Sequence, residues 1–210
     1  HTDNRRQRQM CIRDRYGMPA KMDEILEVAS VFNVPVVEDA AEALGSKING
    51  VPCGSFGRLS ILSFNGNKII TTSGGGAILS NNDRDITEAN FLSTQAKENR
   101  SFYEHKRVGY NYKLSNILSS IGVEQLKVLS KRVKKRRENY LFYFNLLNKV
   151  NGVTFLNEPS GYFSNRWLTC ILVDKKKCGI SADKVISKLE DEKIETCLLY
   201  TSPSPRDVST

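Results

Sequence analysis

Three side chains in the first third of the chain are a carboxylate, an amine and a hydroxyl that could act on one ligand. Asp39 follows the apolar run 34–38, Lys68 comes 29 residues later, and Ser63 precedes that lysine by five positions. A carboxylate at a strand end can bond a protonated pyridine nitrogen, which keeps the ring able to accept the electrons of a carbanion. A lysine amine can condense with a cofactor aldehyde and then move a proton between two carbons. The serine hydroxyl would bind a phosphate group. Together the three side chains therefore suit the cofactor pyridoxal phosphate.

Each of these features is weak by itself. Most lysines are solvated surface amines, and an aspartate after a strand commonly caps a turn or a helix. The run 74–76 is Gly-Gly-Gly, which lets the backbone come close to a ligand but is also typical of loops. The order and context of all of them together favour a cofactor site.

The elements that must position these groups alternate between helices and short strands. Apolar spacing and turn residues predict helices over 20–33 and 83–95, and strands over 34–38, 59–64 and 77–80. This alternation predicts an α/β fold with a mostly parallel sheet. Ligands of such sheets bind beyond the carboxyl ends of the strands, and the three candidate side chains all come at or just after strand ends.

The second half of the chain predicts a connecting helix and part of another domain. A long helix is expected over 116–150, with an apolar stripe made of Leu114, Ile117, Leu118, Ile121, Val128 and Leu129. Strands over 153–156 and 167–173 and a helix over 181–189, capped by Ser181, predict an incomplete α+β small domain over 151–195. Residues 16–115 would form a partial cofactor-binding large domain.

The two ends of the chain carry a signature of foreign coding sequence. Residues 10–15 back-translate as ATG TGT ATA AGA GAC AG, and the reverse complement of that string encodes Cys-Leu-Leu-Tyr-Thr, which is the sequence at 197–201. A sequencing adapter read at both ends of a gene fragment explains this complementarity. We therefore predict that 1–15 and 196–210 are translated adapter, and that this polypeptide alone is inactive and poorly soluble.

Composition excludes several classes of function. The chain carries a formal net charge of +8, of which the arginine-rich head contributes +3, and the remainder is too small to indicate nucleic acid by itself. Cys53, Cys170 and Cys178 show no paired spacing, which suggests a reducing, cytoplasmic location. No apolar run has the length of a membrane span. His105 is the one histidine outside the head, so we expect no metal site and no Ser-His-Asp triad.

Four motifs and a fifth run, in order along the chain, resemble a known family. They lie at 37–46 (VEDAAEALGS), 53–57 (CGSFG), 63–76, 109–112 (GYNY) and 164–168 (SNRWL). With them, residues 16–195 resemble the nucleotide-sugar aminotransferases of the DegT/DnrJ/EryC1/StrS family. Within that family the resemblance is to the branch that aminates UDP-linked 4-keto sugars on the way to bacillosamine-type diamino sugars. It implies the fold of the pyridoxal phosphate transferases related to aspartate aminotransferase.

The resemblance also implies roles for individual residues. Lys68 would hold the cofactor covalently and shuttle the proton, Asp39 would pair with the pyridine nitrogen, and Glu42 would lie near the ring hydroxyl. Ser63 would bind the cofactor phosphate. Asn111 would reach the phosphate of a neighbouring subunit, which implies a homodimer with a shared active site. The substrates implied are an amino acid donor, glutamate in our interpretation, and a nucleotide-linked keto sugar.

Two other functions stay open at this point. A non-catalytic regulator that binds pyridoxal phosphate would carry the same residues. The basic run 131–137 is also typical of nucleic-acid binding, although seven consecutive helical positions surround the axis and do not form one stripe. Arg166 and His105 each allow either a substrate contact or a structural role.

Overall fold

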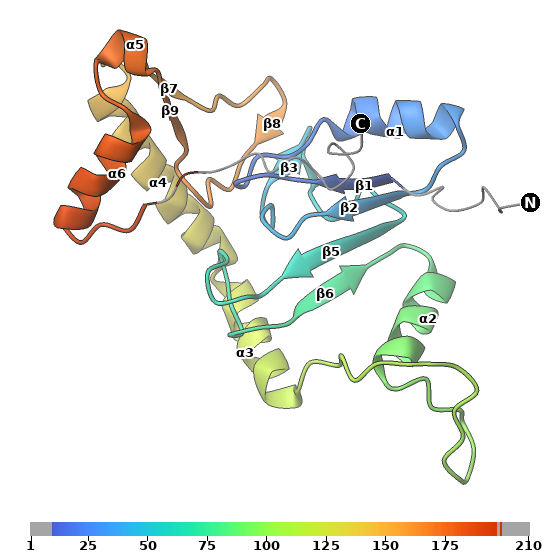
Figure 1. The fold of residues 1–210 in the computed structure, drawn as a ribbon. Coiled ribbons are helices and arrows are strands. Elements are labelled where there is room, and N and C mark those ends of the chain that lie inside the picture. Colours follow the sequence, from blue (N-terminus) through green and yellow to red (C-terminus); the bar gives the residue numbers. More distant parts are fainter. Residues whose placement is uncertain (1–9, 197, 199–210) are drawn as a thin grey trace, which may run out of the picture. The chain divides into compact units, whose positions relative to one another are not determined.

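The structure is a computed structural model that describes residues 10–196 and residue 198, and its chain divides into two compact units (Figure 1). The first comprises the described residues up to Leu141 together with Asn157–Thr169. The second comprises Phe142–Leu156 and the described residues from Cys170 onward. Every candidate site residue lies in the first unit.

A four-stranded sheet forms the centre of the first unit. Its strands are β1 (Met10–Arg13), β2 (Val36–Asp39), β5 (Leu59–Ser63) and β6 (Gly76–Leu79), in the order β1-β2-β5-β6 (Figure 1). The first three run parallel, and β6 is antiparallel to β5. The prediction of an α/β fold with a mostly parallel sheet is confirmed. Asp39 is the last residue of β2, paired in register with Arg13 on one side and Ile61 on the other.

Helix α1 (Met22–Val31) packs against the first residue of β2. Met22 and Ala29, seven residues apart and therefore on the same helix face, are buried with Val36 and Ile48 in one core cluster. This helix is shorter than the predicted 20–33 by two residues at each end. Its burial fixes the start of β2, and with it the position at which Asp39 ends that strand.

A second, antiparallel sheet of the first unit joins segments that are far apart in the sequence. It has the order β4-β3-β8 and is formed by β3 (Lys47–Ile48), β4 (Val51–Pro52) and β8 (Tyr162–Phe163). Strand β8 brings the chain back to the loop that follows β2. Sequence patterns did not predict these two-residue strands, because so short a pairing leaves no periodicity to detect.

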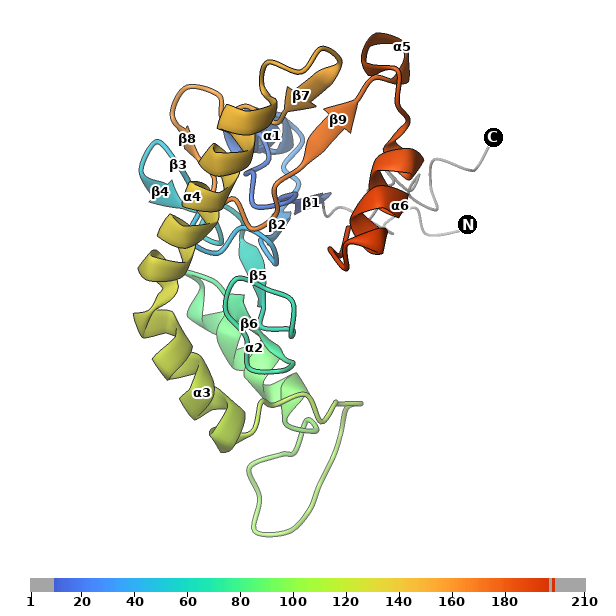
Figure 2. The same cartoon turned by 90° about the vertical axis from the view of Figure 1, so that its left-hand side faces the viewer.

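Two helices replace the single long helix predicted over 116–150. They are α3 (Asn116–Lys127) and α4 (Leu129–Leu147), and Figure 2 shows α3 running directly into α4. The interruption lies at Val128, whose N–H bonds the Gln125 carbonyl at 3.2 Å in a tightened last turn. Gly122, the expected weak point, stays helical and buried, and a Cβ there would lie 3.2 Å from Thr72 Cγ2. None of the described helices combines the length and hydropathy that a membrane crossing requires.

The predicted apolar stripe of this region is only partly buried. Leu129 and Val133 pack into a cluster with Ile69, Ile70 and Trp167. By contrast, Ile117 and Ile121 are 76% and 43% exposed.

Helix α2 (Asp83–Ser93), which packs beside β6, begins as predicted and is capped by the side chain of Asn82.

The second unit combines a two-stranded sheet with two helices. Its strands are β7 (Val153–Phe155) and β9 (Ile171–Val173), which pair antiparallel, and its helices are α5 (Lys175–Cys178) and α6 (Ala182–Asp191). Ser181 caps α6 through its hydroxyl, as expected. Strand β9 begins at Ile171 and not at Trp167.

The predicted small-domain range 151–195 differs from this division, because Asn157–Thr169 belongs to the first unit. Ser164 and Asn165 within that segment are 1% and 0% exposed. The adapter origin of 1–15 and 196–210 stays a prediction. Most of those residues, 1–9, 197 and 199–210, lie outside the described part of the chain.

Candidate active site

Lys68 lies in the tight turn that follows β5. Its backbone N–H bonds the Asn65 carbonyl at 3.0 Å, and the next two residues, Ile69 and Ile70, are buried in the core. The lysine side chain is 11% exposed, and its Nζ lies 3.6 Å from Oε1 of Glu42. An exposed turn, anchored by the two buried residues that follow it, therefore presents this amine to the acidic loop after β2.

Glu42 connects the lysine to the other predicted carboxylate. Its Oε1 also accepts a hydrogen bond from Arg13 Nη2 at 2.8 Å, and its Oε2 accepts one from the Tyr16 N–H at 2.8 Å. The Nε of Arg13 lies 3.7 Å from Oδ2 of Asp39. Lys68, Glu42, Arg13 and Asp39 thus form one continuous cluster of charges, which we call the Lys68 cluster.

Asp39 has the position that the sequence predicted, at the carboxyl end of a parallel strand. Its Oδ1 accepts a hydrogen bond from the Ala41 N–H at 3.2 Å, and its side chain is 21% exposed. The next residue, Ala40, is fully buried and donates its N–H to the Ile61 carbonyl at 3.0 Å. The backbone that carries the carboxylate is therefore held by the sheet.

The other two predicted residues lie apart from this cluster. Ser63 ends β5, and its hydroxyl accepts a hydrogen bond from the Asn65 N–H at 3.3 Å at the start of the turn that carries Lys68. Asn111 is exposed and forms an isolated bridge with Thr94. Among the described residues, no interaction joins Asn111 to the Lys68 cluster.

Trp167 is a neighbour of Lys68 to which sequence reasoning gave no role. The lysine Nζ lies 4.3 Å from the centroid of the indole ring, and the ring Nε1 donates a hydrogen bond to the Asn67 carbonyl at 2.7 Å. This residue is the only tryptophan of the sequence and lies inside the run 164–168. A singular aromatic residue within a family motif was the signal that could have found it.

Arg166 has structural partners. It is 5% exposed, stacks on the Tyr140 ring at 3.7 Å, and pairs with Glu158 at 3.7 Å. Partial burial by itself would raise the pKa of Glu158, but the hydrogen bond from Arg137 and the neighbouring Arg166 hold that pKa below its usual value. His105, the other open residue, is exposed, with Nδ1 3.0 Å from the Gln95 carbonyl.

The basic run 131–137 does not form one exposed face. Val133 is buried in the core, and Arg137 forms a two-point ion pair with Glu158 and contacts the Phe163 ring at 4.2 Å. The lysines and arginines between them point outward on several sides of α4. Part of the run therefore anchors the helix to the segment 157–169.

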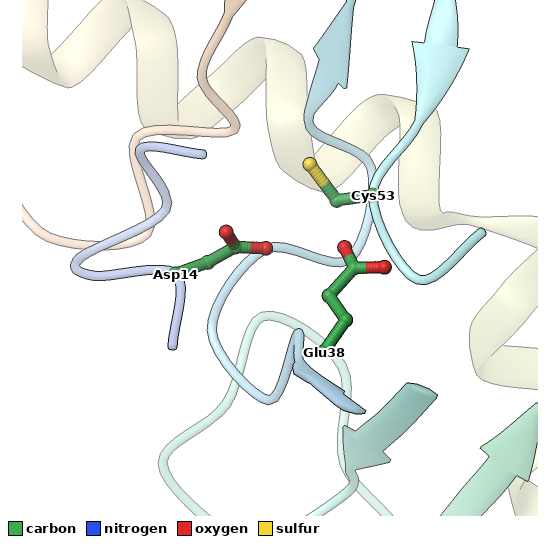
Figure 3. Close-up of side chains that lie close together, drawn as sticks. All are labelled: Asp14, Glu38 and Cys53. Carbon is green, nitrogen blue, oxygen red and sulfur yellow. The ribbon is translucent and has the colours of Figure 1, made fainter. Parts of the chain in front are cut away.

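A second buried cluster consists of Asp14, Glu38 of β2 and Cys53 (Figure 3). Glu38 accepts hydrogen bonds from the Gly54 N–H at 2.6 Å, the Phe56 N–H at 3.0 Å and the Ser60 hydroxyl at 3.0 Å. It thereby fixes the 53–57 loop against the sheet. Gly57 permits this approach, because a Cβ there would lie 2.9 Å from the Glu38 nitrogen.

The groups of this cluster suit a structural role better than a metal site. Burial raises the pKa of the Cys53 thiol, and the neighbouring Asp14 and Glu38 carboxylates raise it further, so the group stays a neutral thiol. Metals bind the thiolate form. Burial also raises the pKa of Asp14 to about 7, against the opposing effect of the hydrogen bond from the Ala20 N–H. Its Oδ2 makes no hydrogen bond with the described residues.

The sequence model of the DegT/DnrJ/EryC1/StrS aminotransferase family matches residues 4–207. The chain belongs to this family. Members of this family depend on pyridoxal phosphate. The residues present fit that cofactor, since a strand-end carboxylate, a nearly buried lysine and a hydroxyl lie in one unit of the fold.

Several curated proteins are similar to this family member over most of its length. EpsN of Bacillus subtilis (strain 168), whose name assigns it to the pyridoxal phosphate-dependent aminotransferases, is 48% identical over 185 residues, which are 88% of this chain and 47% of EpsN. The GDP-perosamine synthase of Vibrio cholerae is 33% identical over 86% of this chain and 49% of its own. A UDP-4-amino-4,6-dideoxy-N-acetyl-beta-L-altrosamine transaminase of Campylobacter jejuni is 39% identical over 60% of this chain and 34% of its own.

Solved structures agree with the fold. The aminotransferase TlmJ of Streptoalloteichus hindustanus has a TM-score of 0.85 with 26% identity, over 91% of this chain and 52% of its own. DesI, solved with its TDP-sugar product, has a TM-score of 0.87 at 22% identity, over 100% of this chain and 54% of its own. The chain therefore spans about half the length of the proteins that it matches.

Proposed function

We propose that the complete protein transfers an amino group from an amino acid to a 4-keto sugar carried on a nucleotide. The proposed donor is glutamate, and the proposed nucleotide is UDP. The overall exchange is balanced: the donor becomes a 2-oxo acid, and the ketone oxygen of the sugar is replaced by the amino group. Pyridoxal phosphate, when bound, supplies the electron sink for the carbanion and carries the amino group between the two substrates.

The observation that carries this proposal is the ion pair between Lys68 and Glu42, because Glu42 lies in the loop that follows Asp39 at the end of β2. Lys68 and Asp39, 29 positions apart in the sequence, therefore both lie at the loop beyond the end of a parallel strand, where ligands of such sheets bind. The family membership supports the reaction class. The names of the relatives, which include a GDP-linked and a UDP-linked sugar enzyme, support a nucleotide-sugar acceptor.

Each residue has a task in this proposal. Asp39 would bond the pyridine nitrogen and keep it protonated, and Lys68 would hold the cofactor and move a proton between the reacting carbon of each substrate and the cofactor. Glu42 orients the lysine amine through their ion pair. Ser63 at the end of β5 bonds the phosphate. We expect Arg13, which lies in the predicted adapter segment, to have no part in the complete protein.

We also propose that the protein is a homodimer in which Asn111 contributes to the site of the partner. Exposed apolar side chains on the segment around Asn111 and on α3 support an interface there. Phe102, Tyr103, Tyr112 and Ile117 are 62%, 80%, 76% and 76% exposed. Several large apolar side chains exposed within one stretch of chain are typical of interaction surfaces.

The test uses the complete protein, recovered from the untrimmed gene. We expect Lys68→Ala to abolish both the absorbance of the lysine-linked cofactor and the transfer of an amino group to a keto sugar. Lys47→Ala removes an exposed lysine on β3 and serves as the matched control, with both signals retained. Turnover with UDP-linked and GDP-linked 4-keto sugars identifies the nucleotide. A lysine-linked chromophore without turnover on any keto sugar would favour the regulator and contradict the proposal.

A further inference from the structure

Trp167 contacts both Lys68 and the residue that precedes it. Its ring face lies 4.3 Å from the lysine Nζ, and its Nε1 holds the carbonyl of Asn67, the residue that precedes the lysine. Trp167 is 6% exposed, so this contact is largely shielded from water. An ammonium group over a desolvated tryptophan face is attracted by the negative face of the ring, and tryptophan gives the strongest such contact among the aromatic residues.

The turn that presents Trp167 also holds the acidic loop. Asn165 Nδ2 donates hydrogen bonds to the carbonyls of Glu42 at 3.0 Å and Leu44 at 2.9 Å, while its Oδ1 accepts one from the Trp167 N–H at 2.8 Å. Asn165 is fully buried. One short turn therefore fixes both the backbone of Glu42, 123 positions from Asn165, and the ring beside Lys68, 99 positions from Trp167.

The first unit leaves space for this turn at Gly17. A Cβ at that position would lie 1.9 Å from Asn165 Oδ1, and the glycine has a φ of +89° that other residues rarely adopt. The hydroxyls of Ser46 and Ser164 both donate to the Gly17 carbonyl, at 2.7 and 2.9 Å. These contacts hold the turn at 164–167 against Gly17.

We propose that Trp167 is a positioning residue for Lys68. It holds the lysine amine beside Glu42 before the cofactor binds. The lysine side chain has four rotatable bonds, and ordering it costs conformational entropy that the ring face and the carboxylate offset. A residue that only filled the core would need neither Nε1 nor a ring beside the amine. The inference rests on the proposed function in one respect, the identity of Lys68 as the cofactor lysine.

The first experiment measures the contact without cofactor. Acetic anhydride acetylates a free lysine amine and releases acetate, and peptide mass spectrometry gives the rate at Lys68 in the complete apo protein. We expect Trp167→Leu to raise this rate by about threefold or more and Trp167→Phe, which keeps a ring but loses the Nε1 hydrogen bond, to give an intermediate rate. Phe163→Leu removes a comparable ring contact, to Arg137, and should leave the Lys68 rate unchanged. Equal rates in wild type and Trp167→Leu overturn the proposal, as does the same increase in Phe163→Leu.

The second experiment compares two forms of the cofactor. Pyridoxal phosphate binds with a covalent link to the lysine, whereas pyridoxamine phosphate has no aldehyde and forms none. We expect Trp167→Leu to weaken pyridoxal phosphate by about tenfold and pyridoxamine phosphate by less than about twofold. Equal loss of both would mean that the tryptophan only maintains the fold, which refutes a positioning role. If wild type forms no link through Lys68, the proposed function fails, while the acetylation rates still decide whether Trp167 holds the amine.

Discussion

Lys68 and Glu42 form an ion pair in which both side chains are nearly withdrawn from solvent, at 11% and 9% exposure with 3.6 Å between Nζ and Oε1. Among the other lysine–glutamate pairs of the described residues is Lys127 with Glu124, in which both side chains are more than 60% exposed. Charges that are shielded from water depend on their partner far more than charges at the surface. The two pairs therefore offer a matched comparison.

Glu42→Gln should lower the free energy of unfolding of the complete protein by about 2 kcal/mol, because Lys68 loses its counter-charge in a shielded position. The amide oxygen still accepts from the Tyr16 N–H, so the loop itself should persist. Urea unfolding at pH 7 measures the change. Glu124→Gln, the exposed control, should change stability by less than about 0.5 kcal/mol. A larger effect in the control than in Glu42→Gln would refute the assignment.

Asp14→Asn should stabilise the chain at pH 8 and leave it nearly unchanged at pH 4. Burial raises the pKa of Asp14 from 3.8 to about 7, so the folded state favours the protonated carboxyl. The stability contributed by that proton is complete below about pH 4 and is lost as the pH rises through about 7, which makes the gain at pH 8 up to about 4 kcal/mol.

The measurement is hydrogen exchange of peptides from the first unit, with the 210-residue chain fused to a soluble carrier. Protection that increases by the same amount at both pH values would show that the charge of Asp14 is not the cause.

Asn165→Ala should cost about 3 kcal/mol of stability, because it leaves the carbonyls of Glu42 and Leu44 and the N–H of Trp167 without their partner in a fully buried site. Thermal unfolding and urea titration of the complete protein measure the loss. Asn151→Ala removes an exposed asparagine whose one long hydrogen bond, at 3.4 Å, reaches the Lys177 carbonyl. That control should stay within about 0.5 kcal/mol of wild type, and an equal loss in both variants would argue against the role of Asn165.

Arg166→Lys should lower stability by about 1–2 kcal/mol and leave KM for the keto sugar unchanged. Lysine lacks the planar guanidinium that stacks on Tyr140 and reaches Glu158. Steady-state kinetics together with urea unfolding separate the two effects. A large rise in KM with unchanged stability would instead identify Arg166 as a substrate contact.

The alternation of helices and strands, the strand that ends at Asp39 and the cap of α6 by Ser181 were predictable, because each is encoded by residues close together in the sequence. The break at Val128 was not. Sequence propensity points to Gly122 as the weak point, yet that glycine is held helical and packs against Thr72. The apolar spacing of α3 predicted a helix, which the structure has. The same spacing predicted a buried stripe, but Ile117 and Ile121 are exposed, because spacing does not say which other residues cover a face.

The sequence by itself determined which chemical groups are present, their order, and the family to which they belong. Only the tertiary structure decided that residues 157–169 return to the first unit and place Trp167 on Lys68 and Asn165 on Glu42. The physical reason is that local patterns report which face of an element is apolar. Contacts between residues a hundred positions apart depend instead on how the whole chain closes, and no periodicity records them.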